Sequence, residues 1–111
     1  MGYRIAICDD EQLDIKYIKE LLHIWQEETN ISLQIETFTS AENFLFHYAE
    51  DKLYDIILLD IELGGMDGVT MAKKIRKENK TVQIIFISGY SDYIAEGYEV
   101  EALHYLLKPV N

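Results

Sequence analysis

Residues 56–59 read Ile-Ile-Leu-Leu and are followed directly by Asp60. Four consecutive aliphatic side chains bury both faces of an extended strand, which is typical of a central parallel strand covered by helices on either side. We therefore predict a strand over Asp55–Asp60 at the centre of an α/β sheet. Asp60 is expected to stand at the carboxyl end of that strand.

Further apolar runs of strand length occur on both sides of this segment, and the stretches between them have the spacing of amphipathic helices. The other expected strands are Arg4–Cys8, Leu33–Phe38, Val82–Ser88 and Ala102–Lys108. The expected helices are Glu11–Glu28, a segment that begins at the capping-box pattern Thr39-Ser40-Ala41-Glu42, Asp67–Glu78 and Asp92–Tyr98. This alternation predicts an open, doubly wound sheet of five parallel strands in the flavodoxin-like order 2-1-3-4-5.

Length and composition narrow the class of protein. The 111 residues suffice for one compact domain, and 49% of them are hydrophobic. The formal charge of -10, from twenty acids and ten bases, would repel a phosphate backbone, so this chain is not expected to bind nucleic acid. No apolar run approaches the ~20 residues of a membrane helix, and we expect a soluble, cytoplasmic protein with no membrane partner.

Polar residues follow four of the five expected strands. Asp9 and Asp10 come after the first strand, Asp60 ends the third, Ser88 the fourth and Lys108 the fifth. Ligands of open α/β sheets bind beyond the carboxyl ends of the strands, where the strand order reverses. Since the first and third strands are neighbours in the expected order, the three carboxylates should converge there.

Three neighbouring carboxylates repel one another unless a cation neutralises them, and hard oxygen ligands suit Mg²⁺. A bound Mg²⁺ would leave Asp60, on the central strand, to attack phosphorus as a nucleophile. Lys108 and Ser88 could then contact the phosphoryl oxygens.

Each of these residues also has a plainer interpretation. Asp9 and Asp10 could form a turn or a helix cap, Ser88 could simply end a strand, and Lys108 could be a solvated surface lysine. The glycines at 64, 65 and 68 match neither the phosphate-binding loop nor the dinucleotide fingerprint, and we interpret them as a flexible turn. It is the combination of five residues at one sheet edge that favours a chemical site.

Four segments resemble the receiver domain of bacterial response regulators, the CheY-like family, over residues 5–109. They read Ile-Cys-Asp-Asp-Glu at 7–11, Leu-Asp-Ile-Glu-Leu-Gly-Gly-Met-Asp-Gly at 59–68, Phe-Ile-Ser-Gly at 86–89 and Tyr-Leu-Leu-Lys-Pro at 105–109. Residues 93–109 look like the subfamily that carries a LytTR-type DNA-binding output domain. Where the family usually has Pro-Gly-Met-Asp-Gly, residues 64–68 of this chain read Gly-Gly-Met-Asp-Gly. Glycine in place of the proline should loosen this loop.

The resemblance implies specific roles. Asp9, Asp10, Asp60 and the backbone carbonyl of Glu62 would hold Mg²⁺, and Asp60 would become the aspartyl phosphate. Ser88 and Lys108 would contact the phosphoryl group, and Tyr105 would change rotamer with Ser88 on activation. A cis peptide is expected at Lys108–Pro109 and a sensor histidine kinase as phosphoryl donor, and Glu62, Gly89 and Tyr90 would form the pocket rim.

The leading hypothesis is therefore a phosphorylation switch rather than a turnover enzyme. A pseudo-receiver that signals only through protein contacts is one alternative, although such modules usually lack an acid or the lysine. A Mg²⁺-dependent phosphate-ester hydrolase is another, suggested by the spacing Asp60-Ile61-Glu62, but the chain leaves little room for a cap over a substrate.

The sequence stops at Asn111, directly after the last expected strand. We expect a single receiver domain over 1–111 that ends before its fifth helix, with its output domain in the missing part. One face of Val82–Ile87 and of Leu103–Leu107 should then be exposed, and such an apolar face predicts self-association.

Overall fold

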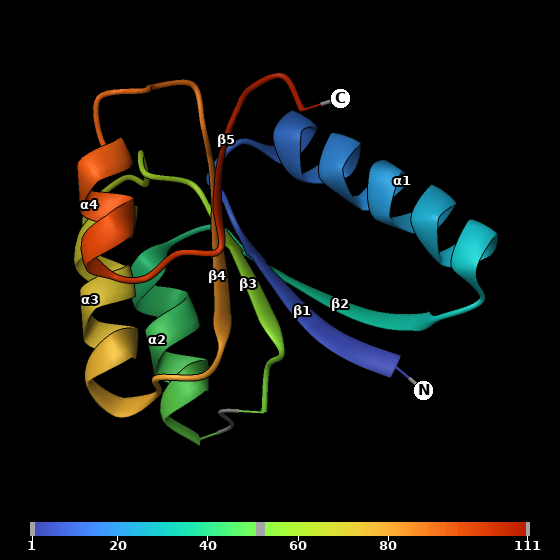
Figure 1. The fold of residues 1–111 in the computed structure, drawn as a ribbon, viewed down its shortest axis with the longest axis horizontal. Helices are drawn as coiled ribbons and strands as arrows, with labels where there is room; N and C mark the ends of the chain where they lie inside the picture. Colours follow the sequence, from blue (N-terminus) through green and yellow to red (C-terminus); the bar gives the residue numbers. More distant parts are fainter. Residues whose placement is uncertain (1, 51–52, 111) are drawn as a thin grey trace.

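The computed structural model describes residues 2–50 and 53–110. A sheet of five parallel strands runs through the molecule in the order β2-β1-β3-β4-β5 (Figure 1). This is the predicted order, and β3 lies at its centre. The strands are β1 Gly2–Cys8, β2 Ser32–Phe38, β3 Ile56–Leu59, β4 Gln83–Ser88 and β5 His104–Leu107.

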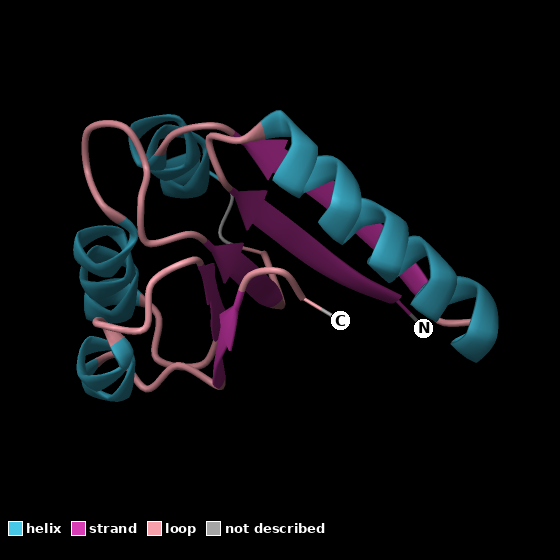
Figure 2. Cartoon of the chain, turned by 90° about the horizontal axis from the view of Figure 1, so that it is seen from above, coloured by secondary structure: helices cyan, strands magenta, loops and turns pink. Residues whose placement is uncertain are grey.

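Helices cover the two faces of the sheet unequally. As Figures 1 and 2 show, α1 lies alone on one face, against the β1 and β2 side, whereas α2, α3 and α4 lie together on the other. These helices are α1 Gln12–Thr29, α2 Ala41–Glu50, α3 Gly68–Glu78 and α4 Ile94–Glu99. In the described part of the chain, no helix combines the length and apolar character that crossing a membrane would require.

Strand β3 contributes to the core on both of its faces, as its aliphatic run predicts. Ile57 and Leu59 are fully buried in the larger apolar cluster, to which α2 and α3 contribute side chains. Leu58 is buried in a smaller cluster with Ile15 and Ile18 of α1. Burial on both sides fixes β3 as the central strand, so its carboxyl end lies in the middle of the sheet edge.

The predicted capping box at the start of the second helix is wrong. Ser40, not Thr39, closes the first turn, because its Oγ accepts a hydrogen bond from the Asn43 backbone N–H at 3.0 Å. The Glu42 carboxylate is used elsewhere, since it accepts from the backbone N–H of Met66 at 3.1 Å. Glu42 thus connects α2 to the loop that follows β3.

The expected exposed face is only partly correct. Ile87 is buried and Ile85 is half-buried, because both pack in the α1-side cluster, which Val110 joins. Val82 is buried in the larger cluster on the opposite face. Leu103, Leu106 and Leu107 are exposed, so the apolar surface lies mainly on and beside β5. Self-association through it stays a prediction.

Candidate functional site

Strand register places the acidic residues side by side. Cys8 at the end of β1 pairs with Leu59 at the end of β3, so the residues that follow, Asp9 and Asp60, leave the sheet at the same level. The Asp60 backbone N–H donates to the Cys8 carbonyl at 2.9 Å, which continues the ladder by one more bond. The carboxyl edge of the sheet therefore presents these two side chains together, as the strand order predicts.

Three carboxylates meet at this edge. One oxygen from each of Asp9, Asp10 and Asp60 lies within 4.8 Å of the others. Asp9 and Asp60 are buried, whereas Asp10 is exposed. Buried carboxylates at such separation destabilise one another unless a cation stands close to them.

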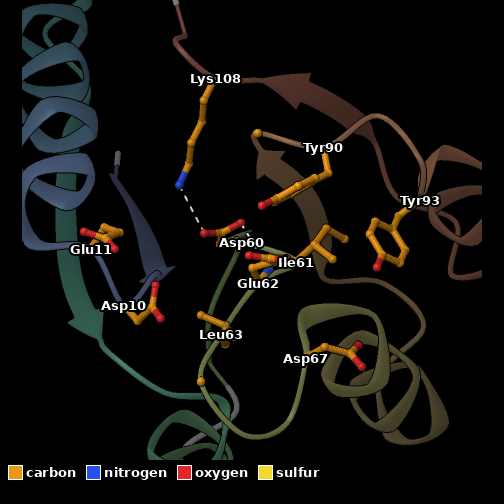
Figure 3. A pocket seen from close by; sticks show the side chains of 12 residues that line it. Asp10, Glu11, Asp60, Ile61, Glu62, Leu63, Asp67, Tyr90, Tyr93 and Lys108 are labelled. Carbon is orange, nitrogen blue, oxygen red and sulfur yellow. Dashed lines mark hydrogen bonds and ion pairs between the residues drawn. The ribbon is translucent and has the colours of Figure 1, made fainter.

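Lys108 supplies one cation. Its Nζ donates to Oδ2 of Asp9 at 3.0 Å and to Oδ2 of Asp60 at 3.1 Å, and Figure 3 shows its side chain reaching down to Asp60. It also donates to Oδ2 of Asp14 in α1 at 2.7 Å. Lys108 follows β5, and its peptide bond to Pro109 is cis, as the family resemblance implies.

The ionisation of the cluster reflects its burial. Burial raises the pKa of Asp60 and of Asp9 above the ordinary value of an aspartate, and the hydrogen bonds from Lys108 oppose that rise only in part. Burial alone would lower the pKa of Lys108, but its hydrogen bonds to Asp14, Asp9 and Asp60 raise it above the usual lysine value. Lys108 is therefore positively charged, and the site can still accept a further cation.

An open cavity of about 560 Å³ gives solvent access to Asp60 and Lys108. Figure 3 shows side chains from several loops around it. Its lining includes each of the expected rim residues, Glu62, Gly89 and Tyr90. Asp10, Glu11, Asp67 and Tyr93 complete the polar part of the lining. A small anionic group could reach the Asp60 carboxylate through this opening.

The two expected switch residues both bind the backbone of Tyr90. Ser88 is fully buried, and its Oγ accepts from the Tyr90 N–H at 3.2 Å. The Tyr105 hydroxyl donates to the Tyr90 carbonyl, and its ring lies 5.9 Å from that of Phe86. Because Ser88 is not among the residues that line the cavity, its hydroxyl would have to move to reach a group bound to Asp60.

The donor set fits a hard divalent cation such as Mg²⁺. Carboxylate oxygens are the ligands that Mg²⁺ prefers, and the open cavity leaves room for its water ligands. The Glu62 backbone N–H donates to Oδ1 of Asp60 at 3.3 Å, which turns the loop back over the carboxylate. The role of the Glu62 carbonyl as a fourth ligand stays a prediction.

Specific contacts hold the loop after β3, residues 64–68, in place. Gly65 has a φ of +95°, a conformation that favours glycine, and Met66 is bound by Glu42. Gly68 is buried as the first residue of α3, where a Cβ would lie 2.1 Å from the Asp60 carbonyl oxygen. The turn interpretation is therefore wrong for Gly68, which lets α3 approach the end of β3 closely.

Sequence reasoning missed two features of the site. Asp14 is the nearest carboxylate to Lys108, but its position in an amphipathic helix resembles that of any solvated acid. The Tyr90 backbone joins Ser88 to Tyr105, and no side-chain pattern reports a backbone contact. Ser88 is the last residue of β4, and its Oγ accepts a hydrogen bond from the Tyr90 N–H just beyond the strand, which agrees with the plainer interpretation of a strand-ending hydroxyl.

Comparison with known proteins identifies the family. Residues 5–111 match the response regulator receiver domain. The sensory transduction protein LytT of Oceanobacillus iheyensis is 37% identical over 98% of this chain and 43% of its own length. LytT of Bacillus subtilis is 34% identical over 96% of this chain and 42% of its own length. The chain thus spans about two fifths of these relatives.

Solved structures agree with the family match. A CheY-like response regulator receiver domain protein from Methanospirillum hungatei superposes with a TM-score of 0.84 at 26% identity, over 100% of this chain and 85% of the other. The BeF3-activated receiver domain of DrrB gives a TM-score of 0.83 at 25% identity, over 100% and 88%. Fold, family match and relatives concur, and the chain belongs to the receiver domains of two-component response regulators, with the LytT and LytR regulators among its relatives.

Proposed function

We propose that Asp60 is the phosphoacceptor of this receiver domain. The observation that carries the proposal is the meeting of a buried Asp60 with Lys108 at 3.1 Å beneath a cavity open to solvent. A carboxylate oxygen of Asp60 would attack the phosphorus of the donor. The new O–P bond forms as the bond between phosphorus and the leaving group breaks, and the leaving group keeps that electron pair.

Mg²⁺ is the cofactor that we propose for this step, held by Asp9, Asp10, Asp60 and the backbone carbonyl of Glu62. When bound, it would neutralise the carboxylates and offset charge on the phosphoryl oxygens. Lys108 would act as a point charge on one of those oxygens, and the pocket edge at Tyr90 would limit the approach of water.

The switch would pass through Tyr90. A phosphoryl group on Asp60 offers a charged acceptor to the hydroxyl hydrogen of Ser88, and this bond would be stronger than the one that Ser88 Oγ now accepts from the Tyr90 N–H. Movement of Ser88 would free the loop that the Tyr105 hydroxyl holds through the Tyr90 carbonyl. Tyr105 packs on Phe86 beside α4, so the α4 and β5 surface would respond to phosphorylation.

The intact protein would act in the cytoplasm between two partners. We propose a sensor histidine kinase as phosphoryl donor and a tethered LytTR-type output domain that binds DNA. The similarity to LytT, a sensory transduction protein of which this chain covers 43%, supports this proposal.

Labelling by radioactive acetyl phosphate in the presence of Mg²⁺ tests the assignment. Wild-type protein should take up one stable label per chain, and Asp60→Asn should take up none, because an amide is not an anionic nucleophile. The control is Asp55→Asn, which makes the same change at the opposite end of β3 and should label normally. Undiminished label on Asp60→Asn would refute the assignment, absence of label on the wild type would favour a pseudo-receiver, and continuous turnover of phosphate esters a hydrolase.

A further inference from the structure

Lys108 has one carboxylate partner that lies outside the phosphoacceptor cavity. Its Nζ is 2.7 Å from Oδ2 of Asp14, closer than to Asp9 or Asp60. Asp14 stands in the first turn of α1 and is not among the residues that line the cavity. It borders instead a second hollow of about 540 Å³, which Lys108 also lines. The ammonium group thus stands between the cavity and α1.

Metal binding and phosphorylation would affect the three carboxylate partners of Lys108 differently. A lysine ammonium has three hydrogens, and these three carboxylates can take one each. Asp9 and Asp60 are the residues that would bind the metal, and Asp60 would also carry the phosphoryl group. Asp14 is the partner whose oxygens neither role consumes.

We propose that Asp14 is a positioning residue, which anchors the Lys108 ammonium at the edge of the cavity while Asp9 and Asp60 are engaged by metal and phosphoryl group. The proposal rests on the proposed function of Asp60. A lysine stem has four flexible carbons, so an ammonium without a fixed partner spends little time in one geometry. Asp14 would hold it where a phosphoryl oxygen arrives.

A second contact holds the same two elements together. The Tyr17 hydroxyl, one turn further along α1, donates to the carbonyl of Val110. Val110 also packs on the apolar cluster that contains Ile18 and Ile87. Side chains of α1 therefore contact the segment after β5 at two places, the Lys108 ammonium and the Val110 carbonyl, which keeps Asp14 within reach of Lys108.

The sign of the effect separates anchoring from simple charge. Asp14 is an acid close to the anion site, so its removal would strengthen anion binding if it acted only through space. Removal of an anchor has the opposite effect, because Lys108 then loses the geometry in which it meets the phosphoryl group. Competition by Asp14 for the ammonium would also make removal strengthen binding.

The test uses beryllofluoride, a phosphoryl analogue, on the 111-residue chain with saturating Mg²⁺, and measures its affinity by fluorine NMR. Asp14→Ala should weaken binding about three- to tenfold, the scale of a charge-assisted hydrogen bond at a partly exposed site. Asp14→Asn, which keeps an oxygen acceptor, should fall between Asp14→Ala and wild type. Glu20→Ala removes an exposed acid from the same helix and should not weaken binding.

A double-mutant cycle identifies Lys108 as the route of the effect. Lys108→Ala should weaken binding more than Asp14→Ala does, and Asp14→Ala should add no further loss in the Lys108→Ala background. Equal or tighter binding by Asp14→Ala, or losses that add, would overturn the anchor and leave the phosphoacceptor site intact. If Asp14→Ala does not fold, unchanged affinity in Asp14→Asn and unchanged Lys108 ammonium signals in its proton NMR spectrum would overturn it. Failure of the wild-type chain to bind beryllofluoride would overturn both proposals.

Discussion

At the scale of single residues, the site contains more negative charge than its one lysine can balance. Three carboxylates accept from Lys108, and Asp10 adds a fourth acid beside them. Burial is the main cause that raises the pKa of Asp60, although an ammonium lies 3.1 Å away, and the negative charge of Asp10 adds to the rise. A site of this kind is prepared for a second cation, and its chemistry should depend on one.

Substitution of Tyr90 offers a test of what sets the lifetime of the proposed phosphate on Asp60. Its side chain lines the cavity and is half exposed, so it can shield an aspartyl phosphate from attacking water. Tyr90→Ala keeps the backbone groups that bind Ser88 and Tyr105, and we expect it to shorten the half-life of the phosphate several-fold. Loss of radiolabel over time measures this, with the exposed Tyr98→Ala as control. An equal or longer half-life would refute shielding.

At the scale of elements, two helical glycines differ in how closely their neighbours pack against them. Gly68 begins α3 where its backbone touches that of Asp60, whereas Gly97 lies within α4 against Tyr105 and Phe86. An added Cβ at Gly68 would be 2.1 Å from a backbone oxygen, but at Gly97 its nearest neighbour is a side-chain carbon at 3.5 Å. The first contact forces the strand end to move, and the second is ordinary packing.

We therefore expect opposite results from two identical substitutions. Gly68→Ala should lower the free energy of unfolding by about 1–3 kcal/mol or more, the usual cost of overpacking, and should impair labelling of Asp60. Gly97→Ala should raise it by about 0.5–1 kcal/mol, because alanine favours the helix. Urea unfolding measures both. A Gly68→Ala protein as stable as wild type would show that α3 can withdraw from Asp60 at no cost.

The elements also show how far sequence reasoning reaches. The aliphatic run of β3 predicts its central place, because a strand buried on both faces leaves few alternatives. Helix starts are harder, since Thr39 and Ser40 are both good caps and only the backbone path selects Ser40. The contact of Asp14 with Lys108 joins residues 94 positions apart, and no local pattern records it.

At the scale of the whole molecule, the strand order carries most of what could be foreseen about the site. Once β1 and β3 are neighbours, Asp9 and Asp60 must meet at the carboxyl edge, and β4 and β5 bring Ser88 and Lys108 to the same edge. What topology does not determine is the present bonding of each group. Ser88 faces the Tyr90 backbone, and Lys108 is shared with α1.

The free energy of unfolding of the whole domain should depend on the ionisation of the buried Asp60. Because burial raises the pKa of Asp60, the folded chain binds that proton more tightly than the unfolded chain does. Ionised Asp60 therefore lowers stability at neutral pH, and the penalty disappears as the pH falls through the raised pKa toward the ordinary value of ~3.9. Asp60→Asn removes the penalty, while Lys108 keeps Asp9 and Asp14 as partners.

Without divalent metal, Asp60→Asn should thus be more stable than wild type at neutral pH, by on the order of 1 kcal/mol. Urea unfolding at a series of pH values checks this, and the advantage should shrink as the pH falls. Added Mg²⁺ should also reduce it, because an ion that binds the folded wild type stabilises that protein in particular. Asp55→Asn, at the exposed opposite end of β3, should gain no comparable advantage. If the difference in free energy of unfolding between Asp60→Asn and wild type changed with neither pH nor Mg²⁺, the buried charge of Asp60 would not limit the stability of the fold.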